Sequence, residues 1–163
     1  MTALGFLRTS DATATLRRAS IEDLSTIVEL LTGDRLGAAR DGADGVAGLE
    51  PYNRAFEAID VDLAHLLLVA EADGQIVATM QLSFLPGLAR RGALRAQIQA
   101  VRVHADLRGS GLGRAMITWA VDQAQRRGCS LVQLTSDKQR PEAHPFYSRL
   151  GFVASHEGFT LVL

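Results

Sequence analysis

One stretch in the second half of the chain constrains the fold most, because a strand pattern, a glycine-rich loop and a helix pattern follow one another there. Residues 96–103 are rich in apolar side chains whose parity changes along the run, so either both faces are buried or a bulge lies near Ala100 and Val101. Apolar residues recur at helical spacing from Leu112 to Ala120, and residues 131–135 return to a strand pattern. We therefore expect a strand–helix–strand unit within a mixed α/β sheet domain.

Turn and capping signals place the other elements. Ser20 stands three residues before Asp23, as in a capping box, and Asp73-Gly74 is a strong hairpin signal between two strand patterns. Residues 33–49 are rich in Gly, Ala, Asp and Arg, which indicates a loop. The predicted elements are strands at 13–17, 66–70, 76–82, 96–103 and 131–135, helices at 20–31, 51–59, 112–127 and 143–150, and a final strand pair at 152–155 and 159–163.

The organisation of the chain and its composition exclude several classes of protein. We expect residues 1–12 to be an N-terminal leader without regular structure and residues 13–163 to be a single domain. The net charge of -1 provides no basic excess for nucleic acid, and no apolar run approaches the ~20 residues that cross a membrane. The one cysteine, Cys129, allows no intramolecular disulfide and is typical of a small buried hydrophobe. These features favour a cytoplasmic protein without a nucleic-acid or membrane partner.

The glycine-rich loop is a candidate phosphate site. It reads Arg-Gly-Ser-Gly-Leu-Gly at residues 108–113, between the end of one predicted strand and the start of a predicted helix. At a helix N-terminus, unpaired backbone N–H groups and the positive end of the helix dipole point outward together, and this attracts anions. Glycine lets the backbone approach a ligand closely, and Arg108 adds a charged donor.

Two better-known phosphate loops do not fit this spacing. A dinucleotide-binding fingerprint would need a third small residue where Arg114 or Met116 stands, and a nucleotide P-loop would need a Gly-Lys-Ser/Thr that is absent. The other alternative is an ordinary glycine-rich turn before a helix.

Two motifs taken together resemble those of the GNAT acetyltransferases. The family signature Arg/Gln-x-x-Gly-x-Gly/Ala after the fourth strand is matched by Arg108, Gly111 and Gly113, and the Phe-Tyr-x-x-x-Gly-Phe hallmark is matched at residues 146–152. Both occur in the family's order and on the expected elements. The resemblance implies the acyl-CoA N-acyltransferase fold, a central, mostly antiparallel sheet with one parallel strand pair and flanking helices. It also implies acetyl-CoA as the acyl donor.

The resemblance further implies which residues hold acetyl-CoA. In enzymes of this kind the loop amides hold the pyrophosphate and the backbone of the fourth strand pairs with the pantetheine arm. Residues near the tyrosine helix add further contacts, and no metal is implied. Carried onto this sequence, the cofactor-binding residues are Val101, Arg102, Val103, Arg108, Gly109, Ser110, Gly111, Leu112, Gly113, Arg114, Ser136, His144 and Tyr147.

Catalytic roles follow from the same resemblance. Tyr147 matches the family's general acid, because a phenol is protonated at pH 7 and can give its proton to the departing thiolate. The alternative is a tyrosine that only packs. Many relatives carry a Glu on the fourth strand as the base, and the matching residue here, Gln99, can only orient a water. The candidates for the proton acceptor are His144, His156 and Glu157.

The acceptor remains open. Where the family commonly has an Asn seven residues before the Tyr, this chain has Arg140, so one contact to the pantetheine arm differs. Arg90, Arg91 and Arg95 either favour an acidic acceptor or are solvated surface charge. We expect direct transfer to a primary amine of a small molecule or peptide, and the family resemblance suggests a homodimer. The alternative function, kept open by Gln99, is a non-catalytic acyl-CoA sensor or interaction module.

Overall fold

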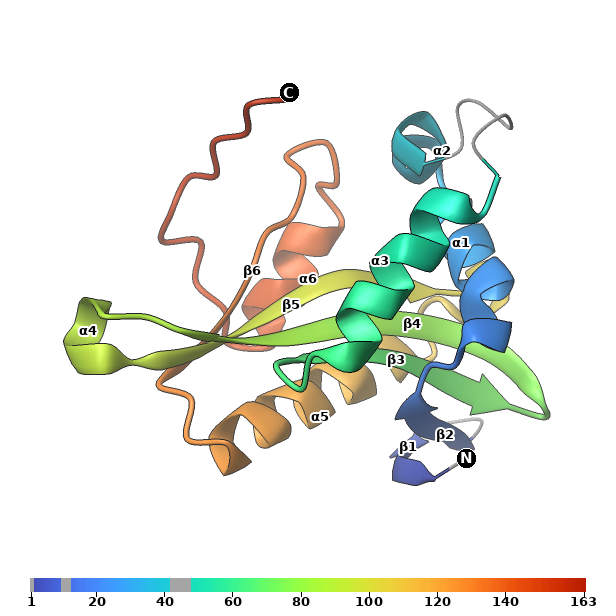
Figure 1. Cartoon of the computed structure of the whole chain (residues 1–163), viewed down its shortest axis with the longest axis horizontal. Coiled ribbons are helices and arrows are strands. Elements are labelled where there is room, and N and C mark those ends of the chain that lie inside the picture. Colours follow the sequence, from blue (N-terminus) through green and yellow to red (C-terminus); the bar gives the residue numbers. More distant parts are fainter. Residues whose placement is uncertain (1, 10–12, 42–47) are drawn as a thin grey trace.

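The computed structural model describes residues 2–9, 13–41 and 48–163, and these form a six-stranded sheet with helices on both faces (Figure 1). The strands lie side by side in chain order, and neighbours are antiparallel except for the parallel pair β5 and β6. The mixed sheet predicted from the sequence is confirmed. The strands are β1 Ala3–Arg8, β2 Thr13–Arg18, β3 His65–Ala72, β4 Gln75–Pro86, β5 Leu94–Val103 and β6 Leu131–Leu134.

The two faces of the sheet carry separate apolar cores. On one face, Leu24 and Ile27 of α1 and Phe56 of α3 pack against Val69 of β3. On the other face, α5 and α6 pack over the larger core, which contains the fully buried Met116. The helices are α1 Leu24–Thr32, α2 Arg35–Asp41, α3 Glu50–Val61, α4 Ala89–Gly92, α5 Leu112–Arg126 and α6 Ala143–Arg149, with single 3₁₀ turns η1 Ile21–Asp23 and η2 Ala105–Leu107.

Local signals set several of these boundaries. The backbone N–H of Ser20 donates to Asp23 Oδ2 at 2.7 Å, which is the predicted capping bond before α1. Asp73 and Gly74 have φ values of 51° and 73°, as a two-residue turn between β3 and β4 requires. Gly128, with a φ of 73°, follows α5 in the left-handed conformation that ends many helices.

A buried ion pair ties the start of α1 to the sheet. Arg17 of β2 donates to both carboxylate oxygens of Asp23, at 2.6 and 3.0 Å, and its Nε donates to Glu71 of β3 at 3.0 Å. Burial alone would raise the pKa of Asp23, but the hydrogen bonds from Arg17 and from the Ser20 backbone hold that pKa below its ordinary value. Arg17 and Asp23 are 7% and 6% exposed, so Asp23 depends on Arg17 for its charge compensation, and Arg17 depends on Asp23 together with Glu71.

A β-bulge in β5 sets up the candidate site. Thr79 of β4 pairs with Arg102 and Gln81 pairs with Gln99, so one residue of β4 lies opposite two residues of β5. Ala100 has a φ of 52°, so of the two explanations for the change of parity the structure shows the bulge. Because directly paired residues share a face of the sheet, the bulge puts Gln99 and Arg102 on the same face although they are three positions apart.

Two segments form regular secondary structure, although the sequence predicts that both are irregular. Residues 3–8 of the predicted leader form β1, which pairs with β2 at the edge of the sheet. Its pattern is weak because Leu7 is its one buried residue. Within the predicted loop 33–49, residues 35–41 form α2, where the Asp34 carboxylate accepts from the Gly37 N–H at 2.7 Å. Residues 42–47 of that loop lie outside the described part of the chain.

The predicted final strand pair is wrong. Residues 152–163 are all described and form neither helix nor strand. Val153, Phe159 and Leu161 are 80%, 96% and 84% exposed. Alternation of apolar residues favours a strand only where a neighbouring strand accepts its hydrogen bonds, and this segment has no ladder partner within the described chain.

Candidate active site

The glycine-rich loop has the backbone of an anion-binding turn. Gly109 and Gly111 have φ values of 83° and 91°, which residues with a Cβ rarely adopt. Gly111 caps α5, so the N–H groups of Gly113 and Arg114 lie in the first turn, where no carbonyl of the helix can accept from them. A Cβ built at Gly109 or Gly111 would meet nothing within 4 Å, so the outer side of the loop is open.

Two polar side chains join this loop to the end of β5. The Ser110 hydroxyl donates to the Leu107 carbonyl at 2.7 Å and accepts from the Leu112 N–H at 3.4 Å, which fixes the turn before α5. The exposed Arg108 reaches back, and its Nε donates to the Val103 carbonyl at 3.4 Å. The loop and the end of β5 therefore form one continuous surface.

The sheet is split open beside this loop. β6 pairs with β5 only over residues 95–98, so residues 99–103 have no strand on that side in the described part of the chain. An extended chain of amide groups can pair with such an exposed strand edge. A Cβ at Gly113 would lie 3.6 Å from Val103 and 3.7 Å from Phe146, so α5 begins directly beside the opening and close to α6.

Tyr147 of α6 lies near the same opening. Its half-buried ring meets Phe146 and Phe152 edge-on, with ring centroids 5.1 and 6.0 Å apart. Burial raises the pKa of the phenol above its ordinary value, and the positive charges of Arg102 and Arg140 lower it in part. The hydroxyl is therefore protonated at neutral pH and can serve as a proton donor.

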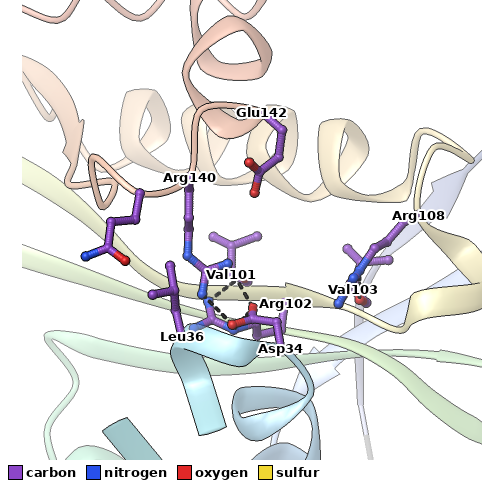
Figure 2. A pocket seen from close by; sticks show the side chains of 9 residues that line it. Asp34, Leu36, Val101, Arg102, Val103, Arg108, Arg140 and Glu142 are labelled. Carbon is purple, nitrogen blue, oxygen red and sulfur yellow. Dashed lines mark hydrogen bonds and ion pairs between the residues drawn. The ribbon is translucent and has the colours of Figure 1, made fainter. Parts of the chain in front are cut away.

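Two arginines and one carboxylate meet in a pocket of about 360 Å³ beside the open edge of β5. Arg140, from the loop before α6, holds both oxygens of Asp34 at 2.8 Å. Arg102 Nε lies 3.8 Å from Asp34 Oδ2. Figure 2 shows both guanidinium groups pointing toward Asp34, with Arg108 apart from them, next to Val103 at the end of β5. We call Asp34, Arg102 and Arg140 the ion cluster.

The carboxylate of the ion cluster is firmly ionised. Burial would raise the pKa of Asp34, but hydrogen bonds from Arg140 and from the Gly37 N–H, together with the charge of Arg102, lower it to about 2. The sequence identifies Arg140 only as a departure from the family pattern, and it does not identify Asp34 as a candidate site residue. No local signal pairs these two residues, because the contact depends on segments that are far apart in the chain.

The predicted proton acceptors do not gather around the ion cluster. His144 lies on α6, and His156 and Glu157 lie on the exposed C-terminal segment; none of the three lines that pocket. Gln99, which is predicted only to orient a water, is exposed on β5. Glu157 accepts from Lys138 at 2.7 Å, which lowers the pKa of that carboxyl, and His156 shares a 2.8 Å hydrogen bond with Ser155.

Other residues singled out in the sequence fall in different places. His144 is exposed on α6 and hydrogen-bonds the Asp137 carbonyl at 3.2 Å, and Ser136 is half-buried just after β6. Arg90 and Arg91 lie in α4, which precedes β5 and so sits at the opposite end of that strand from the ion cluster (Figure 1). Cys129 is half-buried against the larger core, and burial raises the pKa of its thiol.

The described residues contain neither a cluster of metal-ligating side chains nor a helix that could span a membrane. No three His, Cys, Asp or Glu side chains among them converge as a metal site. None of their helices is both long and apolar enough to cross a membrane.

Comparison with known proteins agrees with this geometry. The family model of the acetyltransferase (GNAT) family matches residues 29–152. A glucosamine 6-phosphate N-acetyltransferase of Trypanosoma brucei brucei is 32% identical over 142 residues, which cover 87% of this chain and 90% of that protein. An aminoalkylphosphonate N-acetyltransferase of Salmonella typhimurium is 36% identical over 67 residues, which cover 41% of this chain and 44% of that protein. The match therefore spans less than half of the length of that relative.

Solved structures share the fold. A transcriptional regulator from Bacillus halodurans C-125 superposes with a TM-score of 0.87 at 42% identity, over 92% of this chain and 99% of that chain. A predicted acetyltransferase from Clostridium acetobutylicum, solved with acetyl-CoA, superposes with a TM-score of 0.71 at 21% identity, over 91% and 96% of the two chains.

The split sheet, the amide-lined loop and the adjacent phenol define an acyltransferase architecture. The chain belongs to the GNAT acetyltransferase family. It is therefore an N-acetyltransferase that takes its acetyl group from acetyl-CoA.

Proposed function

We propose that this protein transfers the acetyl group of acetyl-CoA directly to a primary amine, with Tyr147 as the general acid. The observation that carries the proposal is the continuity of three features: the loop at the start of α5, the open edge of β5 and the phenol of α6. A diphosphate, an extended amide chain and a thioester follow one another in acetyl-CoA in the same order.

Each part of this surface has a proposed role. The N–H groups of the loop and the Arg108 guanidinium bind the pyrophosphate, because they present donors and positive potential at a helix N-terminus. The backbone of residues 101–103 pairs with the pantetheine arm along the strand edge that β6 leaves open. Ser136 and His144 border the far side of the arm.

The chemical step follows from these positions. The amine nitrogen forms a bond to the thioester carbonyl carbon, the carbon–sulfur bond breaks, and the Tyr147 hydroxyl gives its proton to the sulfur. The proton lost by the amine passes to water, which the exposed Gln99 amide orients, and solvent returns one proton to the Tyr147 phenolate, so that no net proton is gained or lost. Asp34 is an unsuitable base because its pKa, lowered to about 2, makes it a poor proton acceptor.

The acceptor is proposed to be a small primary amine. The names of two relatives support this, because glucosamine 6-phosphate and aminoalkylphosphonates are small amines that carry a phosphorus oxyanion.

Two measurements test this function. Calorimetry should show acetyl-CoA binding to the purified protein, and a thiol assay should show release of free CoA across a panel of small amines. Failure to bind acetyl-CoA would overturn the proposal as a whole. Unchanged turnover in Tyr147→Phe would remove only the assignment of the general acid.

A non-catalytic role is the second candidate, and one observation favours it. The Bacillus halodurans neighbour, 42% identical, carries the name of a transcriptional regulator, and Gln99 here cannot act as a base. Binding of acetyl-CoA without thiol release from any amine would support the sensor role over acetyl transfer.

We also propose that two copies associate through the C-terminal segment. Phe159, Leu161 and Val162 are 96%, 84% and 87% exposed, and β6 is an edge strand with an open side in the described sheet. Light scattering should give the mass of a dimer for the full chain and of a monomer after deletion of residues 159–163. A monomeric full chain would contradict this.

A further inference from the structure

The bulge in β5 determines where the Arg102 side chain points. Val69, which packs under α1 and α3, pairs with Thr79, and Thr79 pairs with Arg102. Arg102 therefore lies on the α1 side of the sheet, together with Gln99, while Val101 packs against the core on the α5 side. A regular strand would have placed Gln99 and Arg102 on opposite faces.

Three separate segments bring the ion cluster together at this point. Asp34 follows α1, Arg102 lies near the end of β5, and Arg140 precedes α6. Their side chains are 21%, 17% and 20% exposed, so the charges are largely removed from water. Two guanidinium groups share one carboxylate, and the cluster carries a net charge of +1.

Among the described residues that line the pocket, the other charges do not cancel this excess. Arg108 and Glu142 also line it, and their charges offset each other. Figure 2 shows Glu142 apart from the ion cluster, without a drawn interaction to it. A half-buried site with excess positive charge is stabilised by a bound anion, because the charges interact more strongly there than they do in water.

The ion cluster also lies close to the reacting groups. Arg102 and Arg140 both act on the Tyr147 hydroxyl strongly enough to offset part of the effect of burial on the pKa of this phenol. Arg102 shares its face of β5 with Gln99, the residue proposed to orient water. The two arginines line the pocket beside Val101 and Val103, the strand edge proposed to hold the pantetheine arm.

We propose that Arg102 and Arg140 form the binding site for an oxyanion on the acceptor, so that the substrate is a short amine carrying a phosphoryl or phosphonyl group. Guanidinium groups bind such groups with paired, charge-assisted hydrogen bonds. Asp34 holds both arginines in place and limits their attraction for anions in general. This inference rests on the acetyl transfer proposed above and adds the class of acceptor.

The activity test compares amines that differ only in charge. Rates with O-phosphoethanolamine and 2-aminoethylphosphonate are compared with rates for ethanolamine, and β-alanine tests whether a carboxylate suffices. For wild type, kcat/KM should be at least 10-fold higher for the two phosphorus compounds than for ethanolamine. In Arg102→Gln and Arg140→Gln it should fall about 10- to 100-fold for those compounds, the loss expected for charge-assisted hydrogen bonds. The loss is expressed as the ratio of kcat/KM for the phosphorus compounds to kcat/KM for ethanolamine in the same variant, because Arg102 also lies on the strand proposed to bind the pantetheine arm.

Arg126→Gln is the matched control, because Arg126 also pairs with a carboxylate, Asp122 at 2.9 Å, but on the exposed side of α5. It should leave every rate unchanged. Equal kcat/KM for charged and neutral amines in wild type would overturn the proposal, as would an unchanged preference in both Arg102→Gln and Arg140→Gln.

A binding test separates this proposal from the activity itself. Inorganic phosphate is titrated in the presence of saturating CoA, which occupies the glycine loop. Asp34→Asn keeps the oxygen that accepts from Gly37 but removes the negative charge, so phosphate should bind several-fold tighter, whereas Arg140→Gln should weaken it at least 10-fold. Phosphate binding without acetyl transfer would contradict only the proposed function. Transfer to ethanolamine with no phosphate binding would contradict only the oxyanion site.

Discussion

The guanidinium of Arg140 lies 2.8 Å from the carboxylate of Asp34, although 106 positions separate the two residues in the chain. The contact joins the segment between α1 and α2 to the loop before α6. It lies near the end of β5, where β6 no longer pairs with that strand. It therefore connects the end of α1 with the loop that leads into the helix carrying Tyr147.

Asp34→Asn should reveal this contact in the stability of the protein. The pKa of Asp34 is lowered to about 2 in the folded protein from an ordinary value of 3.8, so ionisation of the carboxyl stabilises the fold above pH 3.8. That stabilisation is lost as the pH falls toward 2. Urea unfolding should show wild type more stable than Asp34→Asn by about 1 kcal/mol at pH 7, with the gap closing near pH 2. A gap independent of pH would contradict this origin.

Tyr147→Phe should lower kcat at least 10-fold while leaving the affinity for acetyl-CoA within about 2-fold of wild type. Burial raises the pKa of the phenol, so it remains protonated throughout the neutral range. For wild type, kcat/KM should rise with pH as the amine loses its proton. It should not begin to decrease until the pH exceeds about 10. A fall in kcat/KM between pH 7 and 9 would show that a different acid is at work.

Gly111→Ala should weaken acetyl-CoA binding about 10-fold, measured by calorimetry. Gly111 has a φ of 91°, and an alanine there is strained by about 1–2 kcal/mol, so the loop would change shape. Gly158→Ala is the control, because a Cβ at Gly158 meets nothing within 4 Å and its φ is not in the left-handed region. Equal affinity in both variants would show that the loop does not hold the pyrophosphate.

Asp23→Asn should destabilise the fold by about 3 kcal/mol, because it leaves the buried Arg17 without its bidentate carboxylate. Asp122→Asn, which breaks the exposed 2.9 Å pair with Arg126, should cost less than about 1 kcal/mol. Denaturant unfolding of the two variants measures the difference, and similar losses would mean that burial of the first pair contributes little.

Periodicity and turn chemistry predict most of the fold because they act over a few residues. The helix after the glycine loop, the Asp73-Gly74 hairpin and the bulge near Ala100 all have local causes, and the structure confirms them. β1 is missed because an edge strand with one buried residue has almost no pattern. The final strand pair at 152–155 and 159–163 is wrong because pairing depends on a neighbour that the pattern does not reveal.

The candidate site also has one part with a local sequence signal and one part without such a signal. The loop 108–113 and Tyr147 belong to motifs that are contiguous in sequence, so they could be found by reading the chain. The ion cluster could not be found in this way, because Asp34, Arg102 and Arg140 come from three elements and only the tertiary fold brings them together. The bulge at Ala100 was the one available clue, since it reverses the face of every residue that follows it in β5.

A crystal structure with bound acetyl-CoA is the decisive test of the proposed acetyl transfer. We expect the pyrophosphate on the amides of residues 109–114, the pantetheine arm along residues 101–103, and the thioester sulfur within hydrogen-bonding distance of the Tyr147 hydroxyl. A thioester lying elsewhere, with Tyr147 turned into the packed interior, would contradict it.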